Sequence, residues 1–454
     1  MKANRILAYF AILLAAFGFL IPAIFNGFPL VYSDTGTYIA SGFQGAVPGD
    51  RPITYGLFLR HSSLAASLWF TIIAQALLLS VFGYRLFCNI WSEPKTRWSA
   101  FMVGMVLLIL CSSISYFASM LMADISTSIS LFLLYFLLID TPKSKWIVGL
   151  LGIGYLFFSS MHYTNVYGHL LILIGIGIIK VINKGFLQEF NWRKWVFGSA
   201  LVLMNFLFLP AMHFLNGGGF VTSKNGHLFI TAKIIESGAM QVLLSDKCST
   251  QNFALCQYKD SFPNNASDFL WLPESVLYKI GGWNEHEEEY KTLNKLVFSD
   301  SKYYKLFFGN YFKVLKFHFF QHNIGEELIP LGLQSPPGWE IESNFKEELN
   351  QFLQAKQAQN LLNNKYDGIN FWVNLMLIVS LVLVFFELIF GHPNYYLKGF
   401  IWFSIFMYIG NLFAVCIASS GSRFNSRIDW LFVLCAILIL FSRIGRLKHF
   451  AILK

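Results

Sequence analysis

The stretch ILAYFAILLAAFGFLIPAIF, residues Ile6 to Phe25, decides the fold class. About 20 consecutive apolar residues are what one α-helix needs to cross a bilayer. The run lacks an Ala-x-Ala cleavage site and is longer than a signal-peptide core, so we predict a retained first membrane span. Similar apolar runs follow, and together they predict about ten spans. The predicted spans are 6–25, 64–87, 98–115, 118–139, 146–160, 164–182, 196–215, 368–390, 399–418 and 429–446.

The composition is typical of a polytopic membrane protein. The chain has 454 residues, of which 55% are hydrophobic and 13% are charged, whereas a soluble domain carries about 25% charged residues. The net charge of +9 comes from lysines and arginines that flank alternate ends of the predicted spans, such as Arg193 and Lys194. This positive-inside pattern predicts that both termini are cytoplasmic. We expect no nucleic-acid partner, because no basic stripe with interleaved aromatic residues lies outside the spans.

We therefore predict an all-α polytopic membrane protein in three parts. An N-terminal transmembrane module, 1–215, holds about seven spans and a first outer loop, 26–63. A large hydrophilic loop domain, 216–367, follows on the extracytoplasmic side, and its last part, 343–365, is expected to form a surface helix. A C-terminal module, 368–454, adds about three spans.

The cysteines bear on the compartment. Cys248 and Cys256 share the large loop, so we expect a disulfide between them if that loop faces an oxidising compartment. The other cysteines lie in or beside predicted spans and are interpreted as packing residues. We expect an integral protein of a bacterial inner (cytoplasmic) membrane, surrounded by membrane lipid.

The first outer loop contains the strongest candidate for chemistry. In Val31-Tyr-Ser-Asp-Thr-Gly-Thr-Tyr38, the carboxylate of Asp34 lies just beyond the first span. Asp34 and Tyr38 are four residues apart, so they share one face if the segment is helical. Asp34 could act as a general base at the membrane surface, with partial burial raising its pKa. The alternative is structural: Ser33 caps a helix and Asp34 lies in its first turn.

The same loop continues with Asp50-Arg51-Pro52 and then Tyr55. The planar guanidinium of Arg51 suits a phosphate group. The alternative is an interfacial anchor or a local ion pair with Asp50.

Two polar residues lie at the outer ends of later spans. Asp124 falls within or at the outer end of the fourth predicted span, where an acid is costly and usually faces a polar cavity with a partner. It could instead mark a helix start at the surface. His162 occupies the next outer turn, on the side predicted for Asp34, and is either an interfacial aromatic residue or a functional group.

Arg423 and Arg427 lie in the last outer turn, four residues apart and beside a helix start. Their outer position opposes the positive-inside bias, and an anionic headgroup or a diphosphate would explain it. The alternative is pairing with Asp429 and with outer lipid.

The large loop offers weaker signals. Lys233 and Glu236 could form a helical ion pair or contribute to binding of a donor or acceptor. His318 and His322 are spaced as i and i+4, but without an HExxH pattern we interpret them as interfacial packing residues rather than a metal site. The sequence contains no nucleotide-binding loop, which argues against a nucleotide-powered enzyme.

This set of residues resembles the GT-C superfamily, integral-membrane glycosyltransferases that use polyprenyl-phosphate sugars. The elements that carry the resemblance are Asp34-Thr-Gly-Thr-Tyr38 in the first outer loop, Arg51-Pro-Ile-Thr-Tyr55 before the second span, Asp124 at the fourth span, His162 at the sixth, and Arg423-Phe424 before the last. The match covers residues 1–215 by order and topology and 399–446 more loosely. Arg423-Phe424 replaces the usual Arg-Tyr pair.

The resemblance implies an inverting transfer of a sugar from a polyprenyl-phosphate-linked donor to an extracytoplasmic lipid, glycan or protein. Asp34 would be the catalytic base, Asp124 a second catalytic acidic residue, and Arg51, Arg423 or Arg427 would hold the lipid phosphate. Tyr38, Tyr55, His162 and Lys233 are further candidates for substrate binding. No cofactor is identified, and a divalent metal is compatible with the resemblance. The alternatives are a flippase or transporter, and a polymerase or ligase, of lipid-linked glycans.

Overall fold

The computed structural model describes residues 2–91, 93–362, 366–418 and 421–452. Every regular secondary-structure element in these residues is a helix. The helices are α1 Lys2–Phe19, α2 Ile21–Asn26, α3 Ser33–Gln44, α4 Thr54–Ser62, α5 Leu68–Ile90, α6 Arg97–Cys111, α7 Ile114–Ser119, α8 Ile125–Leu138, α9 Lys145–Ser159, α10 Tyr163–Ile182, α11 Trp192–Leu215, α12 Gly226–Glu236, α13 Ala239–Lys247, η1 Ala254–Tyr258, α14 Ala266–Trp271, α15 Val276–Lys279, α16 Glu287–Ser299, α17 Ser301–His318, α18 Pro336–Asn344, η2 Lys346–Glu348, α19 Leu349–Gln354, α20 Tyr366–Phe390, α21 Tyr395–Ala418 and α22 Arg423–Ile452.

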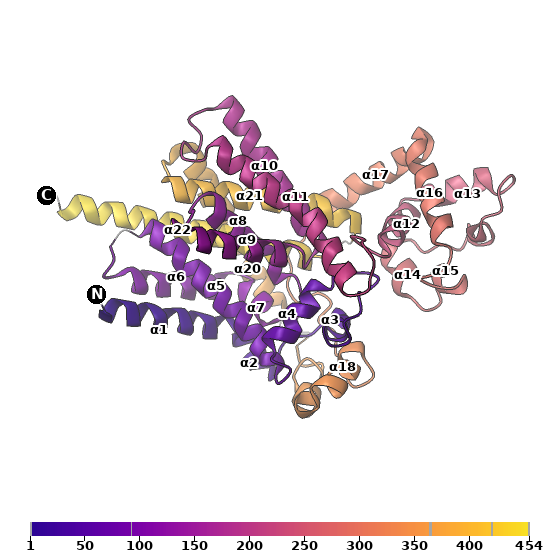
Figure 1. Ribbon diagram of the computed structural model, residues 1–454, viewed down its shortest axis with the longest axis horizontal. Helices are drawn as coiled ribbons and strands as arrows, with labels where there is room; N and C mark the ends of the chain where they lie inside the picture. Colours follow the sequence, from indigo (N-terminus) through magenta and orange to yellow (C-terminus); the bar gives the residue numbers. More distant parts are fainter. Residues whose placement is uncertain (1, 92, 363–365, 419–420, 453–454) are drawn as a thin grey trace.

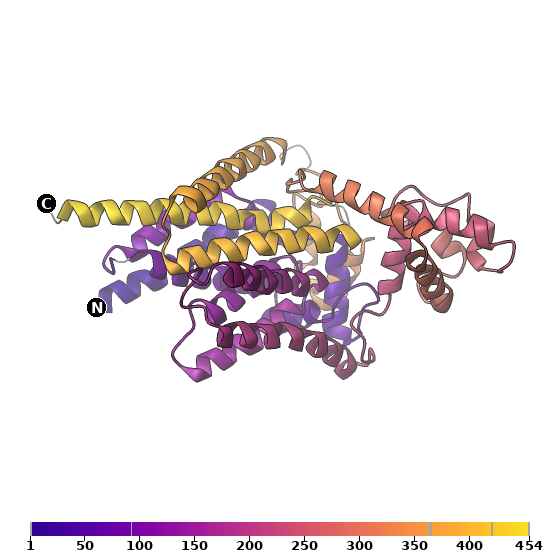
Figure 2. The ribbon, with the colours of Figure 1, turned by 90° about the horizontal axis from the view of Figure 1, so that it is seen from above.

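The long apolar helices lie side by side in an elongated bundle (Figures 1 and 2). Helix α1 begins, and α22 ends, at one end of this bundle. The helices α12–α17 form a separate lobe at the opposite end, and α18 also lies toward that end. The two termini therefore share an end of the molecule, and most of the large loop occupies the other.

Six helices within the described residues are long and apolar enough to cross a membrane: α5, α10, α11, α20, α21 and α22. The chain is thus an all-α protein with apolar helices of membrane-spanning length. The other four predicted spans overlap the shorter apolar helices α1, α6, α8 and α9. The predicted span 6–25 is divided, because α1 ends at Phe19 and α2 begins at Ile21. The consecutive helices α12 and α13 are bent by 91° at the break between them, and counting them as one span would raise the number of candidate spans in the described residues to seven. The number of ten spans stays a prediction.

The short helix α8 has a local cause. The predicted span 118–139 is interrupted: its first two residues end α7, residues 120–124 are not helical, and Leu30 pairs with Met120 there as an isolated bridge. The Leu30 N–H donates to the carbonyl of Ser119 at 2.9 Å, and the N–H of Leu121 donates to the carbonyl of Leu30 at 2.9 Å. Helix α8 therefore contains only the 14 residues from Ile125 to Leu138.

The side chains of the large loop divide between two hydrophobic clusters. Residues of α12–α17 form a cluster of their own, which includes Leu228, Leu243 and Leu293. Residues between 324 and 362 belong instead to the main cluster of the helical bundle. Cys248 and Cys256 form the expected disulfide within the separate lobe.

The predicted surface helix 343–365 is wrong over the residues described. Helix α18 ends at Asn344, and α19 covers only Leu349–Gln354. Glu348, between these two helices, attaches the segment to the start of α5: its carboxylate accepts a hydrogen bond from Leu68 N–H at 3.0 Å and another from the hydroxyl of Ser67. Residues 363–365 lie outside the described chain.

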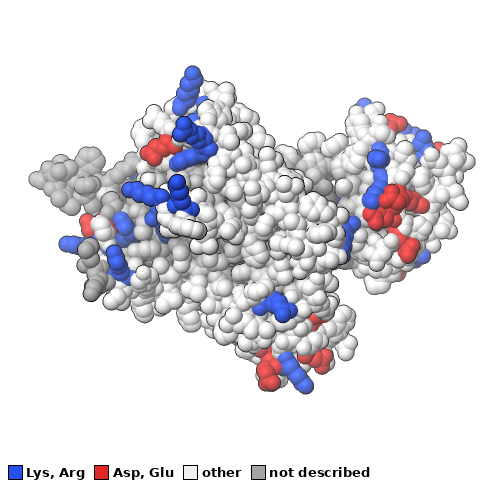
Figure 3. All heavy atoms as spheres, in the orientation of Figure 1, with Lys and Arg blue, Asp and Glu red and all other residues white. Residues whose placement is uncertain are grey.

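Charged residues are sparse on the bundle. On the face in Figure 3, the middle of the bundle is almost free of lysine, arginine, aspartate and glutamate, and basic side chains gather toward the end that holds the termini. The lobe of α12–α17 carries both signs of charge. The pattern suits an apolar belt in a bilayer, while the side that faces the cytoplasm stays a prediction.

Candidate functional site

Asp34 lies in the first turn of α3, beside the start of α8. Thr35 fixes the beginning of α3, because its hydroxyl accepts a hydrogen bond from the N–H of Tyr32 at 3.0 Å. The same hydroxyl donates to the carbonyl of Leu121 at 3.1 Å, which joins this turn to the segment that precedes Asp124. A carboxylate in the first turn also interacts favourably with the helix dipole. The structural alternative foreseen for Asp34 is partly right, although Tyr32 and not Ser33 is the cap.

Arg51 reaches Asp34 because α3 and α4 cross very closely. A Cβ atom on Gly42 would lie 2.2 Å from the carbonyl oxygen of Gly56, so the crossing requires glycine at position 42. This approach brings the connecting loop back over the start of α3. Arg51 Nη2 donates to Asp34 Oδ1 at 3.0 Å, and Arg51 also pairs with Asp50.

Arg423 contacts three carboxylates from separate parts of the chain. Its Nη1 lies 3.0 Å from Glu327, its Nη2 lies 3.7 Å from Asp34 Oδ2, and its Nε lies 3.9 Å from Asp124 Oδ2. The guanidinium covers the ring of Tyr32, with 4.6 Å from Cζ to the ring centroid. The side chain of Arg423 is 9% exposed, and its Nε has no hydrogen-bond partner within the described residues.

Arg427 lies deeper, one helical turn farther along α22. It has no exposed surface and donates to Asp124 Oδ1 at 3.3 Å and to the hydroxyl of Thr164 at 2.7 Å. The side-chain oxygen of Asn411 on α21 also accepts from it. Burying a guanidinium requires partners for its charge and its N–H groups. The residue before α8 and residues of α10 and α21 supply partners for Nη1 and Nη2, while Nε has no hydrogen-bond partner within the described residues.

The remaining sequence candidates support this cluster. His162 caps α10, where its Nδ1 accepts from the N–H of Thr164 at 3.3 Å. Tyr38 packs under the guanidinium of Arg51, 5.1 Å from Cζ to the ring centroid, and against Tyr55 at 4.7 Å between ring centroids. Tyr55 is buried and donates its hydroxyl hydrogen to Gln75 at 2.8 Å. It therefore packs against Tyr38 and supports the cluster without being exposed.

The electrostatics of the cluster correct one expectation. Burial alone would raise the pKa of Asp34, but the charges of Arg51 and Arg423 outweigh it and lower the pKa below its ordinary value. The raised pKa expected from the sequence is therefore wrong. Burial and the arginines lower the pKa of His162 well below its ordinary value, so that imidazole is neutral.

Lys233 is separate from these residues. It lies on α12, with Nζ 3.1 Å from both oxygens of Glu236. The pair lines a pocket with Asn310 and Tyr311 of α17 and Cys416 of α21. The helical pair was one of the two sequence interpretations, and this contact confirms it.

Several members of the cluster were not selected from the sequence. Tyr32, Thr164 and Asn411 are ordinary neutral residues, and Glu327 lies in a loop that carries many charges. These residues are close together because distant segments of the chain contact each other, and a local sequence pattern does not predict such contacts. No group of three or more histidine, cysteine or acidic residues in the described parts of the chain could hold a metal ion.

Comparison with protein-family models, with curated proteins and with solved structures gives no match for this chain, so the resemblance to the GT-C superfamily stays a hypothesis from its motifs.

Proposed function

We propose that the chain is an inverting membrane glycosyltransferase that moves a sugar from a polyprenyl-phosphate-linked donor to an extracytoplasmic acceptor. The observation that supports this proposal is the meeting of Asp34 with Arg51 and Arg423 at one end of an apolar helical bundle. The arginines offer charge for a phosphate leaving group, and Asp34 offers a base beside them. The bundle offers apolar surface for a lipid tail.

Asp34 suits the role of general base. Its lowered pKa keeps the carboxylate ionised at neutral pH, although it also makes Asp34 a weaker base than an unperturbed aspartate. Its side chain is 29% exposed, against 3% for Asp124. In the proposed step, the acceptor hydroxyl gives its proton to Asp34 while its oxygen attacks the anomeric carbon. The bond from that carbon to the phosphate oxygen breaks, and the phosphate leaves with the electron pair.

Arg51 and Arg423 would stabilise the negative charge that develops on the leaving phosphate. Arg423 is a stronger candidate for this role than Arg427, because its side chain is 9% exposed whereas that of Arg427 has no exposed surface. Arg427 and Asp124 would act as positioning residues, since both are almost completely buried and form an ion pair with each other. This differs from the expectation that Asp124 is catalytic and that Arg427 binds substrate. No step of the proposal involves a metal.

The test is transfer of label from radioactive polyprenyl-phosphate hexoses in membranes that contain the wild-type protein or the variant Asp34→Asn. Loss of a general base lowers the rate by about 10²- to 10⁴-fold, while Asp34→Asn should reach the membrane in normal amount. The variant Asp260→Asn, which changes an exposed residue of the lobe, should keep full activity. Full activity of Asp34→Asn would overturn the assignment of the base.

A flippase for lipid-linked glycans is the second candidate, and one observation favours it. A buried chain of polar side chains runs among α8, α9 and α10, where transporters often hold polar groups. Thr127 donates to Asn165 at 2.8 Å, and His169 lies between Tyr155 at 3.1 Å and Ser130 at 3.4 Å. Proteoliposomes decide between the two: a flippase moves a labelled lipid-linked sugar across the bilayer without consuming it. A polymerase or ligase would instead join two lipid-linked glycans into a longer product.

A further inference from the structure

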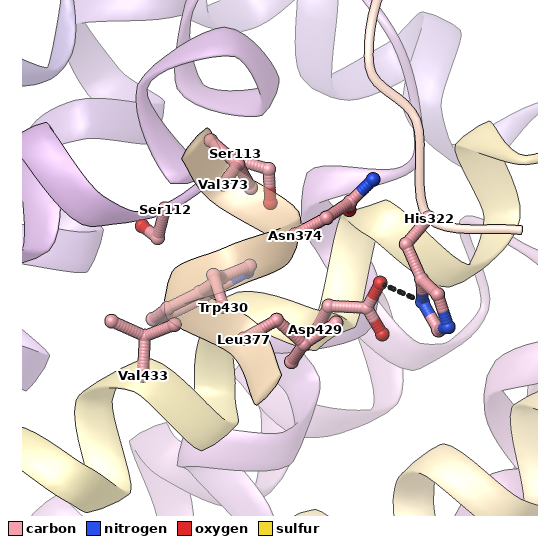
Figure 4. Close-up of a pocket in the computed structure, with 9 residues that line it drawn as sticks. All are labelled: Ser112, Ser113, His322, Val373, Asn374, Leu377, Asp429, Trp430 and Val433. Carbon is pink, nitrogen blue, oxygen red and sulfur yellow. Dashed lines mark hydrogen bonds and ion pairs between the residues drawn. The ribbon is translucent and has the colours of Figure 1, made fainter. Parts of the chain in front are cut away.

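The segment 318–327, here called the strap, is fastened to the start of α22. Backbone carbonyls of the strap accept hydrogen bonds from side chains of α22 and the residue before it. The pairs are Asn425 to His318 and Gln321, and Ser422 and Ser426 to Asn323. His322 Nδ1 also lies 2.7 Å from Asp429 Oδ2, and Figure 4 shows this pair at the edge of a small pocket between α20 and α22.

Two adjacent glutamates at the end of the strap have different surroundings. The carboxylate of Glu326 accepts hydrogen bonds from the N–H and the hydroxyl of Ser422, so it belongs to the fastening. Glu327 points instead to Arg423, with 3.0 Å between Oε2 and Nη1. The backbone of Glu327 has a φ of +65°, a left-handed conformation that costs free energy for a residue other than glycine.

Glu327 is the carboxylate around Arg423 that can leave most easily. Its side chain is 52% exposed, whereas those of Asp34 and Asp124 are 29% and 3% exposed. Asp34 is also held by Arg51, and Asp124 by Arg427. The fastening of the strap does not depend on the side chain of Glu327, so that side chain can move away while the strap stays in place.

The charge balance of the cluster favours such a movement when an anion binds. The three cations Arg51, Arg423 and Arg427 meet four carboxylates, those of Asp34, Asp50, Asp124 and Glu327. An incoming phosphate would face this excess of negative charge in a partly buried place, where like charges repel strongly. Removing one carboxylate from Arg423 restores the balance and frees one edge of its guanidinium.

We infer that Glu327 occupies an anion subsite on Arg423 in the unliganded protein, and that a phosphate-type anion displaces it on binding. Glu327 then acts as a built-in competitor: an anion that makes two contacts with the fork of Arg423 replaces it, and a singly charged carboxylate does not. Identifying that anion as the phosphate of a lipid-linked donor rests on the proposed function. The subsite itself rests on the contacts of Arg423.

The experiment measures binding of inorganic pyrophosphate to the purified full-length protein in lipid nanodiscs by calorimetry at fixed pH. If the carboxylate holds Arg423 for about nine-tenths of the time, the apparent Kd of wild type is raised about tenfold. Glu327→Gln should therefore bind about tenfold more tightly than wild type. The variant Glu327→Gly is a second test, because glycine adopts a φ of +65° without strain, and it should bind as tightly as Glu327→Gln.

The control is Glu347→Gln, which removes one negative charge from an exposed residue of the same large loop; its Kd should equal that of wild type. Equal binding by wild type, Glu327→Gln and Glu327→Gly would overturn the inference but leave the proposed transfer reaction intact. Loss of sugar transfer in Asp34→Asn with tighter binding in Glu327→Gln would support both. No pyrophosphate binding by any variant would overturn the anion subsite, and sugar transfer by the wild type would then be judged on its own assay.

Discussion

Arg427 and Asp124 are 303 positions apart in the chain and 3.3 Å apart in the structure, with both side chains almost completely buried. The contact joins the start of α22 to the start of α8. Through these two residues the C-terminal helices are fixed against the N-terminal module, and Arg423 is placed one turn away from Arg427 to meet Asp34.

Asp124→Asn should therefore destabilise the protein strongly. Removal of one partner of a buried ion pair leaves an uncompensated charge and costs about 3–5 kcal/mol. Thermal unfolding in detergent measures the loss. The matched control is Asp246→Asn, which breaks the exposed pair with Lys302 and should cost less than about 1 kcal/mol. Similar unfolding temperatures for the two variants would contradict the supporting role of Asp124.

The carboxylate of Asp34 should remain ionised throughout the physiological pH range. Its pKa is lowered in the folded protein, so its contribution to stability is present above the unfolded pKa of about 3.9 and is lost as the pH falls through the folded pKa. Activity of the wild type should show no acidic decline between about pH 5 and pH 8 that depends on Asp34. A decline centred near pH 6 in the rate of sugar transfer would contradict this assignment.

His322 should make stability depend on pH in the opposite direction. Burial lowers the pKa of His322, but the charge of Asp429 outweighs burial and raises it. The pair then stabilises the protein fully below the unfolded pKa of about 6.5, and this contribution is lost as the pH rises through the folded pKa. Between about pH 5.5 and pH 8.5 the unfolding temperature of wild type should fall more than that of His322→Gln. The control His286→Gln, on the exposed start of α16, should follow wild type.

The side of the membrane on which the lobe lies can be tested through its disulfide. Cys248 and Cys256 are joined, which is expected only of a compartment that does not reduce disulfides. In intact cells, a membrane-impermeant maleimide should label the protein more strongly after mild reduction than before it. The double variant Cys248→Ser with Cys256→Ser should lose this increase. Labelling that is independent of reduction would place the lobe on the cytoplasmic side.

Continuous apolar runs in the sequence predict most of the long helices of this protein, although the run 6–25 is divided between α1 and α2. The predicted span 368–390 corresponds to α20, Tyr366–Phe390. The apolar pattern fails to predict the start of α8, because residues that it assigns to the helix form the bridge with Leu30 instead. Asp34 and Arg423 stand out because a charge beside an apolar run is unusual, whereas Glu327 looks ordinary in a loop with many charges. Its role arises only when the strap folds back over α22, and such a long-range contact has no local signal.

The close crossing of α3 and α4 leads to the last prediction. A methyl group at position 42 would meet the backbone carbonyl of Gly56 at 2.2 Å, and a backbone atom cannot move aside as a flexible side chain can. Gly42→Ala should therefore separate α3 from α4 and lower the free energy of unfolding by about 1–3 kcal/mol. It should also move Arg51 away from Asp34, so the rate of sugar transfer should fall even in protein that still folds. Gly309→Ala is the matched control, because that helical glycine of α17 has no atom within 4 Å of the added methyl group, and alanine there should raise stability by about 0.5–1 kcal/mol. Unfolding temperature and transfer rate, measured together, test the crossing: if Gly42→Ala behaves like Gly309→Ala in both, the contact between α3 and α4 does not position Arg51.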